Sequence, residues 1–143
     1  MKYYLDTSIV ASLYVPERHT KSISDFLIEN KQYTICISRL VETEFYSVLA
    51  IKKRSNELSD SAVRSISDLF SRHLEMNSYE FAHLTDRHFL RAIDFLKIFK
   101  TNLRTLDALH LACCAEISAT MITADKELSK AAKSLSIECQ LIQ

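Results

Sequence analysis

Short apolar stretches alternate with longer amphipathic stretches along the whole chain. The short ones are rich in β-branched and aromatic residues, which favours strands, and the longer ones carry apolar residues at helical spacing. Strands are therefore expected at 3–5, 33–37, 78–81, 120–123 and 138–142, and helices at 9–15, 19–29, 39–54, 57–74, 86–100, 106–117 and 125–134. Because strands that alternate with helices form parallel sheets, the pattern predicts an α/β fold with helices on both faces of the sheet.

Apolar spacing within the helices also predicts which side of each one packs inward. The helices at 39–54 and 57–74 are expected to form a lobe beside the sheet, and this apolar pair also offers a surface to a dimer or a partner. Ser38, Thr85 and Thr105 each precede a helix, where a hydroxyl can cap the free backbone amides. The inward residues are expected to be Val41, Phe45, Val48 and Leu49 in the first of these helices, and Phe89, Leu90, Ile93, Leu96 and Phe99 in the helix 86–100.

Length and composition are those of one ordinary globular domain, 1–143, in which 48% of the residues are hydrophobic and 25% are charged. No apolar run approaches the roughly 18 residues that a membrane span needs. Asp6 interrupts the N-terminus too early for the apolar core of a signal peptide. We therefore expect no membrane partner and a cytoplasmic location.

Charge is balanced, with 18 Lys and Arg against 18 Asp and Glu. A nucleic-acid ligand would need local basic groups or a metal, because no basic footprint covers the chain. The run Lys52–Arg54 is one local group, and a solvated helix end that complements the helix dipole explains it equally well. The absence of glycine excludes P-loops and glycine-rich dinucleotide-binding loops, and leaves turns to residues such as Asn and Ser.

The four cysteines do not form the paired motifs of zinc sites. They lie in apolar surroundings, which predicts small buried hydrophobic residues in a reducing compartment. They are Cys36, Cys113, Cys114 and Cys139.

Two acids directly follow predicted strands. Asp6 follows the strand 3–5, and Asp125 comes just after 120–123. The carboxyl ends of parallel strands share the edge of the sheet where ligands bind, so the two acids are expected to lie close together. Each also has a purely structural interpretation as a helix N-cap, with Thr123 as a rival cap for the last helix.

Two further acids lie on predicted helices. Asp107 sits in a helix that is apolar almost all round, where burial of a charge requires compensation. The helix dipole compensates a first-turn acid, and a metal would do so more fully. Glu44 lies beside the core face of its helix, whereas Glu42 is turned by about 200°. We expect Glu44 to face the sheet edge, the alternative being an ordinary surface glutamate.

Carboxylates that meet at one edge repel each other, and a divalent cation removes that conflict. Magnesium fits because it takes oxygen ligands and keeps several waters, whereas zinc would call for a Cys and His set. His110, one turn after Asp107, can hydrogen-bond to it, and is either a satisfied core histidine or a catalytic base.

These residues resemble the PIN-domain family, and within it the VapC toxins of type II toxin–antitoxin systems. The family usually has a glycine before Leu103, where this chain has Asn102, a residue that can take the same left-handed turn. The fold implied by the resemblance is a three-layer α/β/α sandwich with a central, mostly parallel sheet of about four to five short strands. The matching pieces are Tyr4–Ser8, Ser38–Leu40, Glu44–Ser47, Leu103–Ala112 and Thr123–Asp125.

The resemblance further implies an endoribonuclease that depends on Mg²⁺ or Mn²⁺. Asp6, Glu44, Asp107 and Asp125 match the family's catalytic and metal-binding acids, with Asp6 and Asp107 as direct ligands, and Ser8 and Thr123 match supporting positions. The partners implied are an RNA substrate, a cognate antitoxin and a second copy of the chain. Arg39 and Arg104 are either phosphate contacts or surface arginines at helix starts.

Two alternatives stay open within the family: a PIN nuclease outside toxin–antitoxin systems, and a scaffold that binds RNA or a partner without cutting. A phosphatase of the haloacid dehalogenase type begins with a similar strand, but it requires a second acid where this chain has Ser8. A receiver domain likewise requires an acidic pair beside the first strand.

Overall fold

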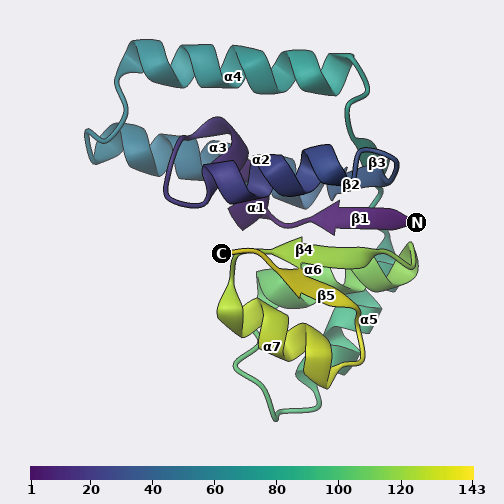
Figure 1. The fold of residues 1–143 in the computed structure, drawn as a ribbon. Helices are drawn as coiled ribbons and strands as arrows, with labels where there is room; N and C mark the ends of the chain where they lie inside the picture. The colour runs from purple at the N-terminus through teal and green to yellow at the C-terminus, as the bar shows by residue number, and fades with distance from the viewer.

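Five parallel strands form the centre of the structure, a computed structural model that describes residues 1–143 (Figure 1). Their order across the sheet is β3-β2-β1-β4-β5, and every neighbouring pair is parallel. This confirms the α/β prediction, with a sheet that is entirely parallel. The strands are β1 (Lys2–Leu5), β2 (Thr34–Ser38), β3 (Glu80–Ala82), β4 (Thr120–Thr123) and β5 (Cys139–Leu141).

Seven helices cover the sheet in two layers. Right-handed crossovers between parallel strands place the first four on one face and the last three on the other, above and below the strands in Figure 1. The three-layer arrangement is therefore confirmed. The helices are α1 (Thr7–Tyr14), α2 (Thr20–Glu29), α3 (Arg39–Arg54), α4 (Asp60–Glu75), α5 (Asp86–Leu96), α6 (Thr105–Glu116) and α7 (Lys126–Ser134). None of them is long and apolar enough to cross a membrane.

The core runs through the middle of the sheet. Tyr4 and Leu5 on β1, and Met121 and Ile122 on β4, are completely buried. Burial on both sides of a strand is what a parallel sheet with two helical layers produces. The end of β1 therefore delivers the next residue, Asp6, into a water-poor environment.

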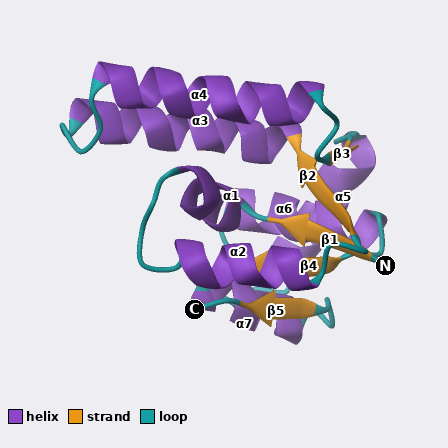
Figure 2. Ribbon diagram, turned by 45° about the horizontal axis from the view of Figure 1, so that its top comes forward, coloured by secondary structure: helices purple, strands orange, loops and turns teal.

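The two helices α3 and α4 lie side by side as a lobe that stands away from the sheet, as predicted (Figure 2). An aromatic cluster holds the lobe to α1: the Phe45 and Phe70 ring centroids are 4.4 Å apart, and Phe70 is 5.1 Å from Tyr14. Phe70 is the one fully buried residue of α4, so the attachment of this helix depends strongly on it.

The predicted inward face of α5 is largely wrong, because only Leu96 of its five residues is half-buried against neighbouring residues of α6. Phe89, Leu90 and Ile93 are 50%, 63% and 44% exposed, and Phe99 lies beyond the end of the helix at Leu96. The buried face carries Ala92, which joins a cluster with Ala108, Leu109 and Ala112 of α6. Small residues let the two helices approach closely, so the alanine face rather than the bulky face packs inward.

Smaller corrections concern helix ends and turns. The helix expected from residue 57 begins at Asp60 after the cap Ser59, and the N-cap of α6 is Arg104 rather than Thr105. Asn102 does not take a left-handed conformation, which occurs instead at Phe99, with φ of 56°. The other left-handed residues are Asn56, Asn77, Ser118 and Ser136.

The cysteines agree with the prediction of small buried residues. All four are free thiols, and Cys36, Cys113 and Cys114 are buried whereas Cys139 is half-buried. Burial raises the pKa of Cys36 and of Cys113 to about 11, and that of Cys114 to about 12. These three thiols are protonated at neutral pH and are therefore unreactive.

Candidate catalytic and metal site

The strand order reverses between β1 and β4, because the chain moves outward from β1 through β2 and from β4 through β5. A crevice opens at the carboxyl ends of strands at such a point, and ligands of α/β proteins bind there. Asp6 follows β1 and Asp125 follows β4 at this edge, and the backbone N–H of Asp6 donates to Ile122 O at 3.2 Å. The two acids that follow strands are thus placed at the same edge of the sheet, where the strand order reverses.

Asp6 is a buried carboxylate held by three donors. Its side chain is only 3% exposed and accepts hydrogen bonds from Ser8 Oγ at 2.6 Å, Thr123 Oγ1 at 2.5 Å and the backbone N–H of Ile9 at 3.1 Å. Burial raises the pKa of Asp6, and the three hydrogen bonds oppose that rise. The bond to Ile9 makes Asp6 the N-cap of α1, so the cap interpretation is confirmed and leaves room for a second role.

The two hydroxyls on Asp6 also fasten it to the connection after β4. Ser8 Oγ accepts from the backbone N–H of Ala124 at 3.0 Å, and Thr123 Oγ1 accepts from that of Asp125 at 2.9 Å. Thr123 is therefore occupied by Asp6 rather than by capping α7. Asp125 is the cap instead, with Oδ1 accepting from Glu127 N at 2.7 Å and Leu128 N at 3.1 Å.

Glu44 is held by hydrogen bonds with a buried histidine and with Thr7, the residue that follows Asp6. His110 Nε2 lies 2.6 Å from Glu44 Oε2, and Thr7 Oγ1 donates to the same oxygen at 2.5 Å. Burial raises the pKa of Glu44, but the hydrogen bonds from His110 and Thr7 outweigh it and leave the pKa below the usual range. Glu42, by contrast, pairs with Arg39 on the helix surface, as the helical spacing predicts.

On the Nδ1 side of its ring, His110 is held in place by a relay of two hydroxyl groups. The hydroxyl of Tyr4 is 2.9 Å from His110 Nδ1 and 2.8 Å from Ser38 Oγ. A neutral imidazole satisfies every group if Ser38 donates to Tyr4, Tyr4 donates to Nδ1, and Nε2 donates to Glu44. His110 is thus a satisfied buried histidine that positions Glu44, and its partner is not Asp107.

Removal of the Tyr4 hydroxyl tests this relay. Tyr4→Phe leaves Nδ1 of His110 and Ser38 without their partner, so we expect the free energy of unfolding to fall by about 1–2 kcal/mol. Urea denaturation followed by circular dichroism measures the change. Tyr33→Phe is the matched control, because the Tyr33 hydroxyl makes no hydrogen bond within the chain. Equal, small losses in both variants would contradict the relay.

Among the four acids, Asp107 has the negative charge that its surroundings compensate least. It lies in the first turn of α6, half-buried, and no side chain donates a hydrogen bond to it. Burial raises the pKa of Asp107, the charge of Asp125 raises it further, and Arg104 offsets only part of the rise. The negative charge of Asp125 is therefore close enough to Asp107 to raise its pKa.

The raised pKa of Asp107 gives a pH-dependent prediction. The stabilising contribution of this group is present below its unfolded pKa and is lost as pH rises through the folded pKa. Without metal, Asp107→Asn should therefore be more stable than the parent at neutral pH, by about 1 kcal/mol or less for a partly solvated charge. The difference should shrink as the pH falls towards 3.8. Urea denaturation across this pH range tests it, and a difference that grows in acid would contradict it.

The donor set around the crevice consists of oxygen atoms. No three His, Cys, Asp or Glu side chains are grouped closely enough to enclose an ion by themselves. Magnesium binds through one or two carboxylates and retains several waters, so it does not require such an enclosure. Asp6, Asp107 and the free Oδ2 of Asp125 are hard ligands of the right kind, and the only partly compensated charge of Asp107 favours a cation. The residues present fit a largely hydrated divalent ion.

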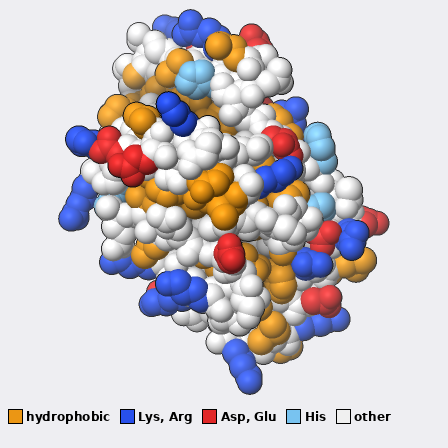
Figure 3. Space-filling view, turned by 45° about the vertical axis from the view of Figure 1, so that its right-hand side comes forward, with side chains coloured by type: hydrophobic (Ala, Val, Ile, Leu, Met, Phe, Trp, Pro, Cys, Tyr) orange, Lys and Arg blue, Asp and Glu red, His pale blue; other side chains and the backbone are white.

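The arginines and lysines singled out in the sequence differ in their surroundings. Arg39 pairs with Glu42 and stacks on the Phe81 ring at 4.1 Å, so both its charge and its plane are engaged. Lys52 and Lys53 pair with Glu57 and Asp60 at the far end of the lobe, which supports the helix-end interpretation. Arg104 is exposed beside Asp107 and has no ion pair. On the face shown in Figure 3, basic and acidic side chains are interspersed.

Thr7, Tyr4 and Ser38 complete the site and were not predicted as members of it. Thr7 and Tyr4 flank the predicted acid Asp6 by one and two residues, which is the only signal that sequence offers. Their partners Glu44, His110 and Ser38 lie 37, 106 and 34 residues away. Hydrogen bonds over such separations follow from strand order, which becomes visible only in the fold.

Comparisons with known proteins agree with this architecture. A comparison with curated proteins finds no significant match. A chain in the crystal structure of VapBC2 from Rickettsia felis, bound to a DNA fragment from their promoter, has a TM-score of 0.73 at 18% identity and covers 100% of both chains. VapC20 from Mycobacterium tuberculosis, a sarcin–ricin loop cleaving toxin, has a TM-score of 0.67 at 17% identity, over 90% of this chain and 94% of that one.

FitAcB from Neisseria gonorrhoeae is similar to the same extent, with a TM-score of 0.67 at 14% identity over 96% and 95% of the two chains. At such identities these likenesses show a common fold. The family assignment comes from the sequence itself, because the family model of the PIN domain matches residues 3–134. The chain therefore belongs to the PIN domain family.

Proposed function

We propose that the protein is an endoribonuclease that hydrolyses RNA phosphodiester bonds with Mg²⁺ or Mn²⁺, and that it is the toxin of a type II toxin–antitoxin pair. The observation that carries the proposal is the set of four acids beside the switch-point crevice: Asp6, Glu44, Asp107 and Asp125. Membership of the PIN family supports a nuclease. The VapC20 likeness, to a toxin that cleaves RNA, supports the toxin class.

Each acid is assigned a role from its surroundings. Asp6 and Asp107 would hold the ion, because one is fixed in a single position by three donors and the other carries the least compensated charge. The other two acids, Glu44 and Asp125, would bind a second ion or orient waters. Glu44 is held by His110 and Thr7, and Asp125 is held by the backbone amides of α7. When bound, a divalent ion supplies an activated water and neutralises the charge that develops on the phosphoryl oxygens.

Ser8 and Thr123 support the site by donating to Asp6, which opposes the rise in its pKa caused by burial and fixes the orientation of the carboxylate. The fixed orientation matters because a preorganised donor set avoids reorganisation during the reaction. Unpaired bases are what side chains can read in RNA, so a single-stranded loop is the proposed target.

The proposed partners are a cognate antitoxin and a second copy of the chain. The exposed residues Phe89, Leu90 and Ile93 form an apolar strip on the outer side of α5, the kind of surface that an interface would cover. The likeness to chains of VapBC2 and FitAcB structures supports an antitoxin partner.

Growth arrest separates a toxin from a PIN nuclease of another kind. Induced expression in a bacterial host should stop growth and produce discrete RNA fragments, and Asp107→Asn should do neither at equal protein level. Asp94→Asn, which removes an exposed and unpaired acid of α5, should arrest growth as the parent does. Normal growth with the active parent protein would contradict the toxin assignment, and arrest by Asp107→Asn would contradict the catalytic one.

A further inference from the structure

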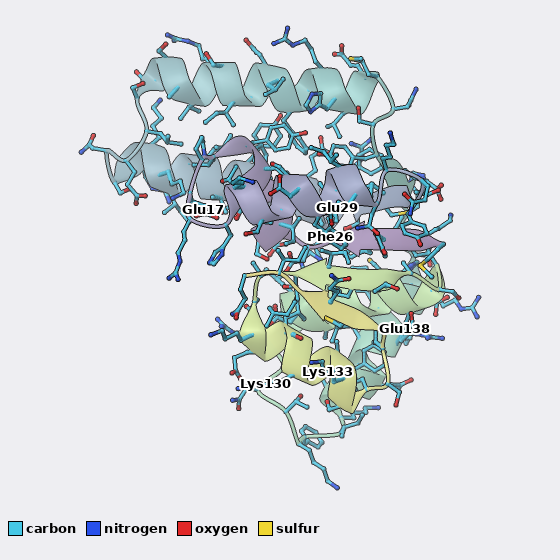
Figure 4. All side chains as sticks on the ribbon, in the orientation of Figure 1. Glu17, Phe26, Glu29, Lys130, Lys133 and Glu138 are labelled. Carbon is cyan, nitrogen blue, oxygen red and sulfur yellow. The ribbon has the colours of Figure 1, made fainter.

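A cleft of about 560 Å³ lies beside the acidic crevice, between the α1–α2 loop and the start of α7. The loop is marked by Glu17 in Figure 4. Arg18, His19 and Ser22 line one side of the cleft, and Ala124, Lys126 and Gln143 line the other. No Asp or Glu side chain lines it, although the chain as a whole is neutral. The charged side chains of the cleft, Arg18 and Lys126, are therefore both cations.

The two cations of the cleft are unpaired. Arg18 and Lys126 are exposed, and neither forms an ion pair with any carboxylate of the chain. Glu17, the nearest acid in sequence to Arg18, accepts instead from Ser12 Oγ. Further along α7, Lys130 pairs with Glu127. The charge of the cleft is thus available to an anion, unlike that of the neighbouring helix surface.

The other groups of the cleft are free hydrogen-bond donors. The hydroxyl of Ser22 makes no hydrogen bond within the chain, and the side chain of His19 does not cap α2. Together with Arg18 and Lys126, they offer the donor types that contact phosphate in nucleic-acid complexes. The composition of the cleft therefore favours a phosphate group over an uncharged ligand.

The cleft adjoins the proposed catalytic acids. The backbone of Ala124, which lines it, donates to Ser8 Oγ at 3.0 Å, and Ser8 Oγ donates to Asp6 at 2.6 Å. Lys126 directly follows Asp125. An RNA strand with its scissile phosphate at Asp6 would therefore carry a neighbouring phosphate into the cleft.

We propose that this cleft binds a backbone phosphate of the RNA substrate, next to the bond that is cut, through Arg18, His19 and Lys126. The inference rests on the proposed ribonuclease function and adds to it a binding subsite. Phosphate contacts position a nucleic acid without reading its bases. The subsite fixes which phosphodiester bond of the RNA lies at the catalytic acids. Recognition of the base sequence is left to other parts of the protein.

The double variant Arg18→Gln/Lys126→Gln tests the subsite. Affinity for a fluorescent single-stranded RNA is measured with chelator present, so that neither cleavage nor bound metal contributes. Loss of one phosphate contact should weaken binding about 3- to 10-fold at low salt and reduce the slope of log affinity against log salt by about 0.7. In cleavage assays with metal, KM should rise by a similar factor while kcat stays within about twofold, because the variant residues contact only the flanking phosphate.

Arg64→Gln/Lys133→Gln is the matched control, since both residues are exposed, unpaired and outside the cleft, and the charge change is the same. It should bind RNA as the parent does, and both double variants should keep the parent's melting temperature. If the two double variants bind equally while the parent cuts RNA, the subsite is wrong and the ribonuclease stands. A parent that neither binds nor cuts RNA would overturn both. Binding of polyglutamate is measured on the same proteins. If Arg18→Gln/Lys126→Gln loses polyglutamate binding as strongly as RNA binding, the cleft binds an acidic protein partner and the RNA assignment is overturned.

Discussion

An Asp6→Asn variant is expected to cleave RNA about 10³-fold more slowly than the parent and to bind Mn²⁺ more weakly. The expected loss corresponds to several kcal/mol of charge stabilisation that a correctly held metal supplies. Asn has the shape of Asp and can still accept from the Ile9 amide, while the hydroxyls of Ser8 and Thr123 can turn to suit the new amide group. The neutral side chain also removes the burial cost that raises the pKa of Asp6.

Asp6→Asn should therefore fold at least as well as the parent, and thermal denaturation without metal checks this. Single-turnover cleavage and Mn²⁺ binding by electron paramagnetic resonance are measured on the same samples. Asp94→Asn, an exposed acid of α5, serves as the control for loss of one negative charge. Weakened Mn²⁺ binding with unchanged cleavage would show that the reaction does not use an ion held by Asp6.

Phe70→Ala is expected to lower the free energy of unfolding by about 3–5 kcal/mol. Phe70 is fully buried, and its ring contacts those of Tyr14, Phe45 and Tyr79 at centroid distances of 5.1, 4.4 and 6.3 Å. The cavity left behind cannot collapse easily, because these aromatic neighbours are held by their own contacts, such as the 2.8 Å hydrogen bond between Tyr14 and Tyr79.

Urea denaturation followed by far-UV circular dichroism measures this loss. Leu69→Ala is the natural comparison, since Leu69 precedes Phe70 on α4 and is 40% exposed. Its change should stay within about 1 kcal/mol, as expected away from a packed core. If the two variants lose the same stability, the aromatic cluster does not hold the lobe in place.

Patterns within short stretches of sequence were sufficient to predict the strands and helices that position the site. Ser38 caps α3 and basic residues close it, so both of its ends were predicted correctly. The strand β1 was predicted from three apolar residues followed by Asp6, and parallel strands brought Asp6 and Asp125 to one edge. The side of α3 that bears Glu44 followed from helical spacing alone. These features depend on residues that are neighbours in sequence.

Features that depend on distant partners could not be predicted. The inward face of α5 is set by Ala108 and Ala112 of α6, against which Ala92 packs; apolar spacing alone favoured the bulkier Phe89 side. The hydrogen bond between His110 and Glu44 joins residues 66 apart, whereas helical spacing indicated only that His110 could reach Asp107. In each case the deciding partner is fixed by topology rather than by the local pattern.

The measurement that tests the account most directly is cleavage of a total small-RNA pool by purified protein, with Mg²⁺, with Mn²⁺ and with chelator, beside Asp107→Asn. The account predicts discrete products with either metal, none with chelator and none from the variant. Equal products from parent and variant, unaffected by chelator, would contradict the assignment of a metal-dependent ribonuclease. The crevice would then belong to a protein that binds RNA or a partner without cutting.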